Sequence, residues 1–344
     1  MEAIKTVLVT GGAGYIGSHI CVELLDAGYD VVVVDNLSNS RFAVIERIER
    51  ITAKKVHFYH QDVREAEALS EVFKAHSIDA VIHLAGLKAV GESCAEPIRY
   101  YQNNLDSTLV LLQVMQQANV GNFVFSSSAT VYGDPETVPM DESFPLFATN
   151  PYGRSKLFIE QMLADVVQSR PELFKVALLR YFNPAGAHPS GLIGEDPAQI
   201  PNNLLPYVTQ VAIGKLEKLS VFGSDYPTVD GTGVRDYIHV IDLARGHVKA
   251  LQFLEKQSAG MCTPINLGAG HGYSVLEIVK TFELVTGISI PYELVDRRAG
   301  DVAIYYANAS LASALLGWKT EKTLEDMLID AWRWQQQNPE GYGD

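Results

Sequence analysis

Tyr152 and Lys156 stand four residues apart in a segment with a helical pattern, so their side chains share one face of a helix. An ammonium group beside a phenol lowers the phenol pKa toward neutrality. Tyr152 can then accept the proton of an alcohol while a hydride leaves the same carbon. Ser128 ends a strand-like run and can hydrogen-bond to that alcohol, which holds it in position. The three residues predict hydride chemistry on an alcohol carbon.

Tyr-x-x-x-Lys alone occurs by chance on many helices, so the prediction depends on what precedes it. Residues Thr10–Gly17 (TGGAGYIG) follow a strand-like run and open a helix, and their spacing satisfies both G-x-x-G-x-x-G and G-x-G-x-x-G. Gly11, Gly14 and Gly17 permit a tight turn and a close approach of the backbone to a pyrophosphate, which helix N-terminal amides then face. The segment predicts a dinucleotide site.

Acidic and small residues at later strand ends narrow the cofactor to NAD. Asp35 ends the second strand-like run, where a carboxylate meets the adenosine ribose hydroxyls and repels the 2′-phosphate of NADP. Asp62 follows the third run, where it can reach the adenine or simply cap a helix. Residues Leu84–Lys88 end the fourth run. The small residues among them, Ala85 and Gly86, let the backbone pass beside the cofactor. Lys88 is expected to contact it.

The elements that must position these residues alternate regularly over the first 185 residues. Continuous apolar runs suit strands buried on both faces of a parallel sheet, and strand–helix alternation predicts a doubly wound α/β (Rossmann) fold. The predicted strands are Val7–Thr10, Val31–Val34, Val56–Tyr59, Ala80–Leu84, Phe123–Ser126 and Val176–Tyr181. The predicted helices between them are Gly17–Ala27, Arg41–Thr52, Ala66–Ala75, Ile98–Gln117 and Tyr152–Ser169.

Beyond residue 183 the alternation of strands and helices ends, and we expect an NAD-binding domain over 1–183 and a smaller, mixed α/β substrate-binding region over 184–344. Residues 184–240 are rich in Pro, Gly and Asn, which predicts a ligand-enclosing region with one helix near Leu205–Gly214. Further helices are expected at Val275–Thr286 and Leu324–Gln336, the latter capped by Thr323 with Asp326. The long helices Ile98–Gln117 and Tyr152–Ser169 are expected on one face of the sheet, where they could form a homodimer interface.

Composition excludes several classes of protein. The 344 residues contain 27 Lys plus Arg and 41 Asp plus Glu, a net charge of −14, which disfavours nucleic-acid and membrane partners. The start lacks the features of a signal peptide, and no apolar run approaches membrane-spanning length. Cys21, Cys94 and Cys262 lack metal-ligand or disulfide spacing, which predicts no metal site and a reduced, cytoplasmic protein.

Longer motifs make a family resemblance specific. The chain resembles the extended short-chain dehydrogenase/reductase superfamily and, within it, the UDP-glucose 4-epimerase family, over essentially its full length. No functional position departs from that family's pattern. The resemblance rests on residues 85–93 (AGLKAVGES), 126–133 (SSSATVYG), 179–184 (LRYFNP), 200–204 (IPNNL) and 230–240 (DGTGVRDYIHV).

The resemblance implies a reversible C4 epimerisation of UDP-glucose and UDP-galactose through a transient 4-keto sugar, with NAD+ retained as hydride carrier. It implies Tyr152, Lys156 and Ser128 as catalytic residues. The implied cofactor contacts are Gly11, Gly14, Tyr15, Ile16, Gly17, Asp35, Asn36, Asp62, Val63, Leu84, Ala85, Gly86, Lys88, Asn103, Ser128, Tyr152, Lys156 and Phe182. The implied UDP-sugar contacts are Asn183, Asn203, Leu204, Val221, Phe222, Arg235, Arg298, Asp301 and Tyr305.

Other functions were weighed against this one. The nucleotide-sugar 4,6-dehydratases of the same superfamily resemble one another in an Asp-Glu pair directly after the strand-ending residue. This chain has Ala129-Thr130 there, which argues against a dehydratase. A non-catalytic NAD-binding module would lack the Tyr/Lys pair, which is intact. Spacing alone leaves open a UDP-glucuronate decarboxylase, or a 4-epimerase that prefers UDP-glucuronate or UDP-N-acetylglucosamine.

Overall fold

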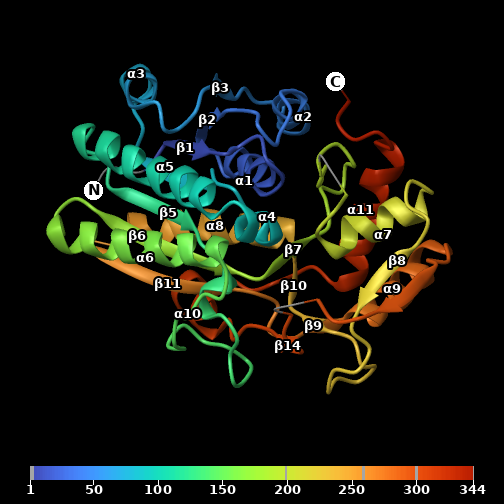
Figure 1. Cartoon of the computed structure of the whole chain (residues 1–344). Coiled ribbons are helices and arrows are strands. Elements are labelled where there is room, and N and C mark those ends of the chain that lie inside the picture. The colour runs from blue at the N-terminus through green and yellow to red at the C-terminus, as the bar shows by residue number, and fades with distance from the viewer. Residues whose placement is uncertain (1–3, 198–199, 258–259, 299–300, 344) are drawn as a thin grey trace.

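A parallel sheet of seven strands organises the computed structural model, which describes residues 4–197, 200–257, 260–298 and 301–343 (Figure 1). Its strands are β1 (Thr6–Thr10), β2 (Asp30–Asp35), β3 (His57–His60), β4 (Ala80–His83), β5 (Asn122–Ser126), β6 (Lys175–Tyr181) and β11 (Met261–Leu267). They lie in the order β11-β6-β5-β4-β1-β2-β3, and every neighbouring pair is parallel. The chain therefore reverses its direction across the sheet between β1 and β4, which is where doubly wound sheets bind ligands.

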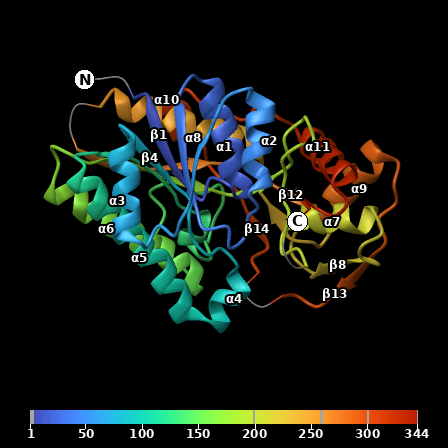
Figure 2. The same cartoon turned by 90° about the horizontal axis from the view of Figure 1, so that it is seen from above.

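Helices cover both faces of this sheet, as Figure 2 shows from above. On one face, α1 (Tyr15–Asp26), α2 (Ala43–Thr52) and α8 (Val240–Glu255) share a buried core with the strands. On the other face, α3 (Ala66–Ala75), α5 (Pro97–Gln117) and α6 (Pro151–Ser169) share a second core. Alternate side chains of β1 divide between the two, because Val7 and Val9 join the first core and Leu8 the second.

The predicted doubly wound fold is confirmed, and the predicted strands match those observed to within one residue at each end. The predicted helices match to within two residues, including α7 (Leu204–Ala212), α9 (Val275–Thr286) and α11 (Leu324–Gln337). Thr323 and Asp326 form the expected capping box at the start of α11. Helices α5 and α6 lie side by side on one face of the sheet, as predicted.

The second half of the chain contributes more to the sheet than the sequence indicated. α8 packs on α1, and β11 pairs with β6 along the whole strand, although both lie beyond the expected division at residues 183 and 184. Short α10 (Ser310–Leu316) packs against α8 and β11. Because β11 hydrogen-bonds to β6, that strand lies inside the sheet and is not its edge.

The remaining elements form a smaller unit beside the sheet, with a core of its own. Helices α7, α9 and α11 pack there with β8 (Leu219–Phe222) and β13 (Tyr292–Val295), which pair in parallel. Trp332 lies edge-on to Phe282 in this unit. Its other strands are β7 (Asn183–Ala185), β9 (Val234–Arg235), β10 (Tyr237–His239), β12 (Tyr273–Ser274) and β14 (Ile304–Tyr305), while α4 (Val90–Ala95) and a 3₁₀ turn, η1 (Ala129–Tyr132), follow β4 and β5.

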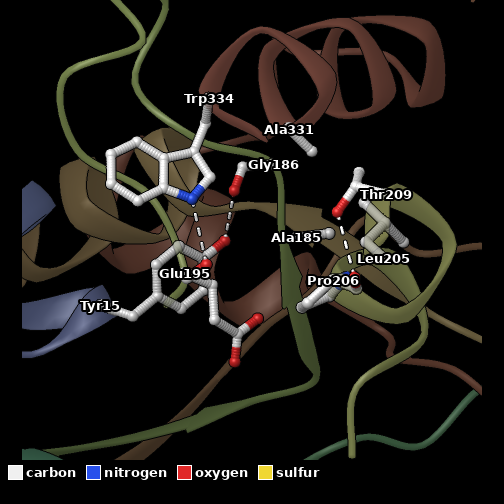
Figure 3. A pocket seen from close by; sticks show the side chains of 9 residues that line it. All are labelled: Tyr15, Ala185, Gly186, Glu195, Leu205, Pro206, Thr209, Ala331 and Trp334. Carbon is white, nitrogen blue, oxygen red and sulfur yellow. Dashed lines mark hydrogen bonds between the residues drawn. The ribbon is translucent and has the colours of Figure 1, made fainter. Parts of the chain in front are cut away.

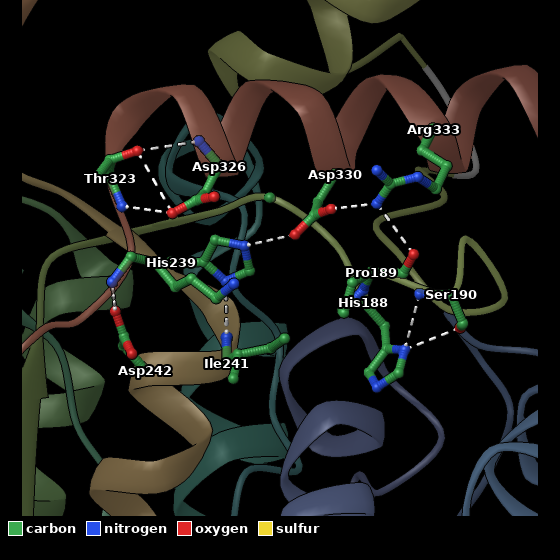
Figure 4. Close-up of polar contacts among 12 residues, drawn as sticks. His188, Pro189, Ser190, His239, Ile241, Asp242, Thr323, Asp326, Asp330 and Arg333 are labelled. Atoms are coloured by element: carbon green, nitrogen blue, oxygen red, sulfur yellow. Dashed lines mark hydrogen bonds and ion pairs between the residues drawn. The ribbon is translucent and has the colours of Figure 1, made fainter.

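Polar contacts hold α11 against β10 and the loop that follows β7 (Figure 4). His239 Nδ1 accepts the Ile241 N–H at 3.1 Å, so its proton lies on Nε2 and is donated to Asp330 Oδ2 at 3.3 Å. Arg333 pairs with the same carboxylate and donates to the Pro189 carbonyl at 2.9 Å. The contacts fix the C-terminal helix beside the loop that enters the site.

Within the described ranges, none of the helices has the length and hydropathy of a membrane span. In the same part of the chain, no three His, Cys, Asp or Glu side chains gather in a way suited to a metal ion.

Candidate active site

The glycine turn lies at the carboxyl edge of the sheet between β1 and β4, and its conformation requires glycine. Gly11 has φ of +71°, and a Cβ there would lie 2.9 Å from the backbone nitrogen of Ala85. A Cβ on Gly17 would lie 2.2 Å from the Gly11 carbonyl oxygen. Gly14 precedes α1 in an extended conformation, so the first-turn amides of the helix face the space above the turn. This arrangement fits the pyrophosphate of a dinucleotide.

The next two residues anchor α1 to the rest of the protein. The Tyr15 hydroxyl donates to the Gly186 carbonyl oxygen at 2.7 Å, which ties the cofactor turn to the loop after β7. Ile16 packs against the core beneath the sheet. Both residues begin the helix, so their backbone amides are at its positive end.

Asp35 lies directly beside the glycine turn. Its carboxylate accepts the Ala13 N–H at 3.0 Å, and its other oxygen accepts from Leu37 N and Ser40 Oγ at 2.9 and 2.8 Å. Asn36 follows and donates to Asp62 Oδ2 at 3.0 Å. A carboxylate fixed at this point is suited to hydrogen bonds from ribose hydroxyls.

Asp62 and Val63 follow β3. Asp62 forms a two-bond ion pair with Arg64, and the hydrogen bonds from that guanidinium hold the Asp62 pKa well below its ordinary value. Val63 is buried in the core above the sheet. Both lie at the carboxyl edge, as predicted, with Asp62 already engaged by protein groups.

The segment after β4 is held by an asparagine that the sequence analysis missed. Asn104 accepts the Leu87 N–H at 2.8 Å and donates to the Leu87 carbonyl and to Ser155 Oγ, at 3.1 and 3.0 Å. A Cβ on Gly86 would lie 3.1 Å from the Asn104 amide oxygen, so the backbone passes very close. Asn103 donates to the same oxygen at 3.0 Å. A polar residue within the apolar face of α5 was the available signal.

Ser128, Tyr152 and Lys156 come together next to this segment. The Ser128 hydroxyl lies beside the Tyr152 phenol and acts to lower the phenol pKa. Lys156 lies one turn along α6 and donates to the Ser126 carbonyl at 2.7 Å, while its ammonium group lies 4.7 Å from the centre of the Phe125 ring. All three side chains are buried. They can serve as a proton acceptor, an orienting hydroxyl and a local positive charge.

The expected low pKa of Tyr152 is not produced by the protein alone. Burial raises the Tyr152 pKa, and the hydrogen bond from Ser128 opposes that rise. Burial also lowers the pKa of Lys156 to about 8, against the opposing charge of Glu160. Desolvation thus outweighs the effect of Ser128, and a further positive charge at the site is needed to bring the phenol toward neutrality.

Thr130 is a second residue that the analysis missed. Its hydroxyl donates to Ser128 Oγ at 2.9 Å, and its backbone N–H lies 3.2 Å from the same oxygen. Because Ser128 accepts from Thr130, its own proton is directed elsewhere, toward Tyr152 or a bound alcohol. The sequence offered only the position of Thr130 in the strand-ending motif as a signal.

Two arginines and an aspartate gather on the side of the smaller unit. Asp301 Oδ1 lies 3.2 Å from Arg298 Nη2 and 3.9 Å from Arg235 Nη2. The Arg298 guanidinium stands over the Phe222 ring, 5.4 Å from its centre. Phe222 is exposed, and Val221 is buried beneath it in β8. Two forked cations beside an aromatic face can bind a diphosphate and stack a base.

Tyr305 joins this cluster to the hydride site. It lies opposite Arg235 in the β14–β9 pair, and its hydroxyl donates to the Ala129 carbonyl oxygen. Its ring centre is 5.6 Å from that of Phe182. Asn183, next along the chain, donates to the Asp236 carbonyl at 3.1 Å. The Tyr305 side chain therefore lies between the cluster of Arg235, Arg298 and Asp301 and the group formed by Ser128, Tyr152 and Lys156.

The start of α7 and the loop before it complete the site, and that loop contains a third residue that the sequence analysis missed, Glu195. Asn203 occupies the N-cap position before Leu204, yet its amide donates to Glu195 Oε1 at 2.7 Å. The same oxygen is 3.4 Å from Lys88 Nζ. Figure 3 shows Glu195 beside Tyr15 in a small pocket that Trp334 also lines. One acidic residue in a glycine- and proline-rich loop had no distinguishing pattern.

Comparisons with known proteins agree with this geometry. A family model described as GDP-mannose 4,6 dehydratase matches residues 8–331. UDP-glucose 4-epimerase of Bacillus subtilis is 59% identical over 336 residues, 98% of both chains, and that of Dictyostelium discoideum is 57% identical over the full length of both. A crystal structure of UDP-glucose 4-epimerase from Bifidobacterium longum in complex with NAD+ and UDP superposes with a TM-score of 0.94 at 55% identity, covering 98% of this chain and 100% of that one.

Proposed function

The chain belongs to the UDP-glucose 4-epimerase family, and from that membership we infer that it interconverts UDP-glucose and UDP-galactose at C4 with NAD as its cofactor. The observation that carries this inference is the grouping of Ser128 with Tyr152, with Lys156 one turn away, at the same sheet edge as the glycine turn. We assign the cofactor contacts named above, from Gly11 to Phe182, to NAD, and the UDP-sugar contacts, from Asn183 to Tyr305, to a nucleotide-sugar-binding region that, apart from Asn183, lies in 184–344. The reaction belongs to galactose metabolism.

Each of the site residues has a separate role in the proposed epimerisation. Bound NAD+ supplies an acceptor for the hydride of C4 and a positive charge that favours the ionised phenol. Tyr152 takes the proton of the 4-hydroxyl, and Ser128 orients that hydroxyl. Arg235 and Arg298 bind the diphosphate, so the 4-keto sugar can turn about its link to UDP while the nucleotide stays in place. The proton would then return from Tyr152 to the C4 oxygen, and the hydride to the opposite face of C4.

The name of the matching family model raises the dehydratase alternative again. Elimination of water needs an additional acid and base beside the strand-ending residue. Here Ala129 and Thr130 occupy those places, and the Thr130 hydroxyl is bonded to Ser128. These side chains support epimerisation.

Retention of the C4 hydrogen tests the proposed reaction. UDP-galactose deuterated at C4 is expected to keep its label in both epimers, because the hydrogen that leaves C4 is the one that returns. The label is followed by mass spectrometry at equilibrium, together with the absorbance of free NADH, which should not accumulate. Exchange of the label with water would instead indicate direct deprotonation of carbon and would overturn the mechanism.

Asp35→Ala is expected to weaken NAD binding and to reduce the discrimination against NADP. The carboxylate beside the glycine turn would no longer accept from the ribose or repel a 2′-phosphate. Binding of both cofactors to the stripped enzyme measures the effect. Asp30→Ala, at the opposite end of β2, serves as the control. An unchanged preference in Asp35→Ala would remove Asp35 from the ribose site.

Tyr305→Ser is expected to widen the range of sugars accepted. The Tyr305 ring contacts Phe182, and Tyr305 pairs with Arg235 between β14 and β9, which puts it where a sugar attached to the diphosphate must turn. Removing it makes room for an N-acetyl group at C2, so the kcat/KM for UDP-N-acetylglucosamine relative to UDP-galactose should rise. Phe144→Ser, in the same apolar cluster, is the matched control. A wild-type enzyme that handles both sugars equally would show that Tyr305 does not select between them.

We further propose a homodimer formed by α5 and α6. Ile98, Leu109 and Phe158 on these adjacent helices are 72%, 46% and 41% exposed, which is unusual for large apolar side chains in one area. A second copy would cover them in a four-helix arrangement, and the molar mass in solution checks it.

The cysteine pattern supports a cytoplasmic location.

A further inference from the structure

The backbone around Glu195 is held in place by the C-terminal part of the chain. The Glu195 carbonyl accepts the indole N–H of Trp334 at 3.1 Å (Figure 3). The Gly194 N–H donates to the Tyr342 hydroxyl at 3.0 Å, and a Cβ on Gly194 would lie 2.4 Å from the Trp334 ring. Glu195 is therefore presented from a fixed point of the loop.

The carboxylate of Glu195 connects two residues that serve different ligands. Its Oε1 accepts from Asn203 Nδ2 at 2.7 Å and lies 3.4 Å from Lys88 Nζ. The Glu195 side chain is only 13% exposed, whereas that of Lys88 is 53% exposed. A partly buried, anchored acceptor thus contacts one residue assigned to the UDP-sugar and another assigned to NAD.

The contact with Asn203 determines which end of its amide faces the site. A carboxylate only accepts hydrogen bonds, so it selects the amide nitrogen of Asn203 and excludes the amide oxygen. The nitrogen carries two N–H groups, and the second can then donate to a phosphate oxygen. Without Glu195 the amide can rotate by half a turn and present its oxygen, which repels a phosphate.

The contact with Lys88 acts by charge. A lysine side chain has four rotatable bonds and loses considerable rotamer freedom when it binds a ligand. An opposite charge at 3.4 Å restricts the ammonium to the end of β4 before a ligand arrives. The benefit is small, because Lys88 is half-exposed and its ion pair is screened by solvent.

We propose that Glu195 is a positioning residue that orients the Asn203 amide for the UDP-sugar and holds the Lys88 ammonium for NAD through the same carboxylate oxygen. The proposal rests on the proposed function for the identity of the two ligands. It predicts that the two tasks respond differently to removal of the charge and removal of the acceptor.

Glu195→Ala, Asn203→Ala and the double variant test the first task. UDP binding to the NAD-loaded enzyme is measured by calorimetry. Each single variant is expected to bind UDP about ten-fold more weakly, the effect of one hydrogen bond to a charged group. The double variant should be no weaker than Asn203→Ala, because Glu195 acts through Asn203. KM for UDP-galactose should rise in Glu195→Ala, with kcat little changed.

Glu195→Gln separates the two tasks. Its amide oxygen can still accept from Asn203, so UDP affinity should stay close to the wild-type value. Its lost charge should speed NAD release by about two- to five-fold, and Lys88→Met should show the same defect without adding to it. Asp196→Asn is the matched control, since it removes the neighbouring charge and leaves an oxygen to accept the Tyr342 N–H.

Additive losses in the double variant, or equal loss of UDP affinity in Glu195→Gln and Glu195→Ala, would overturn the proposal. So would unchanged UDP affinity in Asn203→Ala. Turnover of UDP-galactose by the wild type is a separate readout. A wild-type enzyme that binds UDP but does not epimerise UDP-galactose contradicts the proposed function. The role of Glu195 would then be judged from the UDP affinities of the single and double variants alone.

Discussion

Tyr152→Phe is expected to lower the rate of epimerisation by about 10²–10⁴-fold, the usual loss when a general base is removed. The substitution deletes one buried oxygen, which lies beside Ser128, and keeps the ring that packs in the site. Folding and NAD content should therefore stay as in the wild type. Single-turnover measurement at saturating UDP-galactose isolates the chemical step.

Two control variants show whether the loss of activity is specific to the Tyr152 hydroxyl. Ser128→Ala should be milder, because Tyr152 remains as base and only an orienting hydrogen bond is lost. Tyr29→Phe should have no effect, since Tyr29 precedes β2 and lies at the opposite edge of the sheet from the site. Near-normal turnover by Tyr152→Phe, or a larger defect in Ser128→Ala, would remove Tyr152 from its assigned role.

Arg180→Met is expected to destabilise the protein by about 3–5 kcal/mol, the typical cost of breaking a buried ion pair from one side. Arg180 donates three hydrogen bonds to Glu160, which also accepts from Ser127, and both charged side chains are 4% exposed. The variant leaves the carboxylate buried without its partner. Urea unfolding of the two proteins at one enzyme concentration measures the difference in the free energy of unfolding.

Arg99→Met is the matched control for that experiment. Arg99 pairs with Glu92 and Glu96, but these side chains are exposed to solvent, which screens the charges. Its unfolding midpoint should stay close to that of the wild type. An equally small change in Arg180→Met would show that the buried pair contributes no more than a surface pair.

Local patterns in the sequence predicted most of the sheet and the residues at its carboxyl edge. Apolar runs such as Val31–Val34 can only be buried on both faces, so they specify interior strands of a parallel sheet. The glycine turn was recognised from the spacing of its glycines, and the structure shows that Gly11 and Gly17 have no room for a side chain. Tyr152 and Lys156 could be paired from their spacing, because helix geometry alone places them on one face.

Tertiary structure decided what local patterns do not contain. The return of β11 to the sheet depends on the exposed edge of β6, which lies more than 80 residues earlier in the chain. The net direction of the Tyr152 pKa depends on burial by residues remote in sequence, and it opposes what the Tyr-Lys spacing suggested. Lys88, Glu195 and Asn203 become neighbours only when β4, the loop after β7 and α7 meet. The sequence alone determined six of the seven strands, the glycine turn and the pairing of Tyr152 with Lys156, because each follows from short-range geometry. The contacts of Glu195 and the charge state of the site follow from long-range packing, which no short motif encodes.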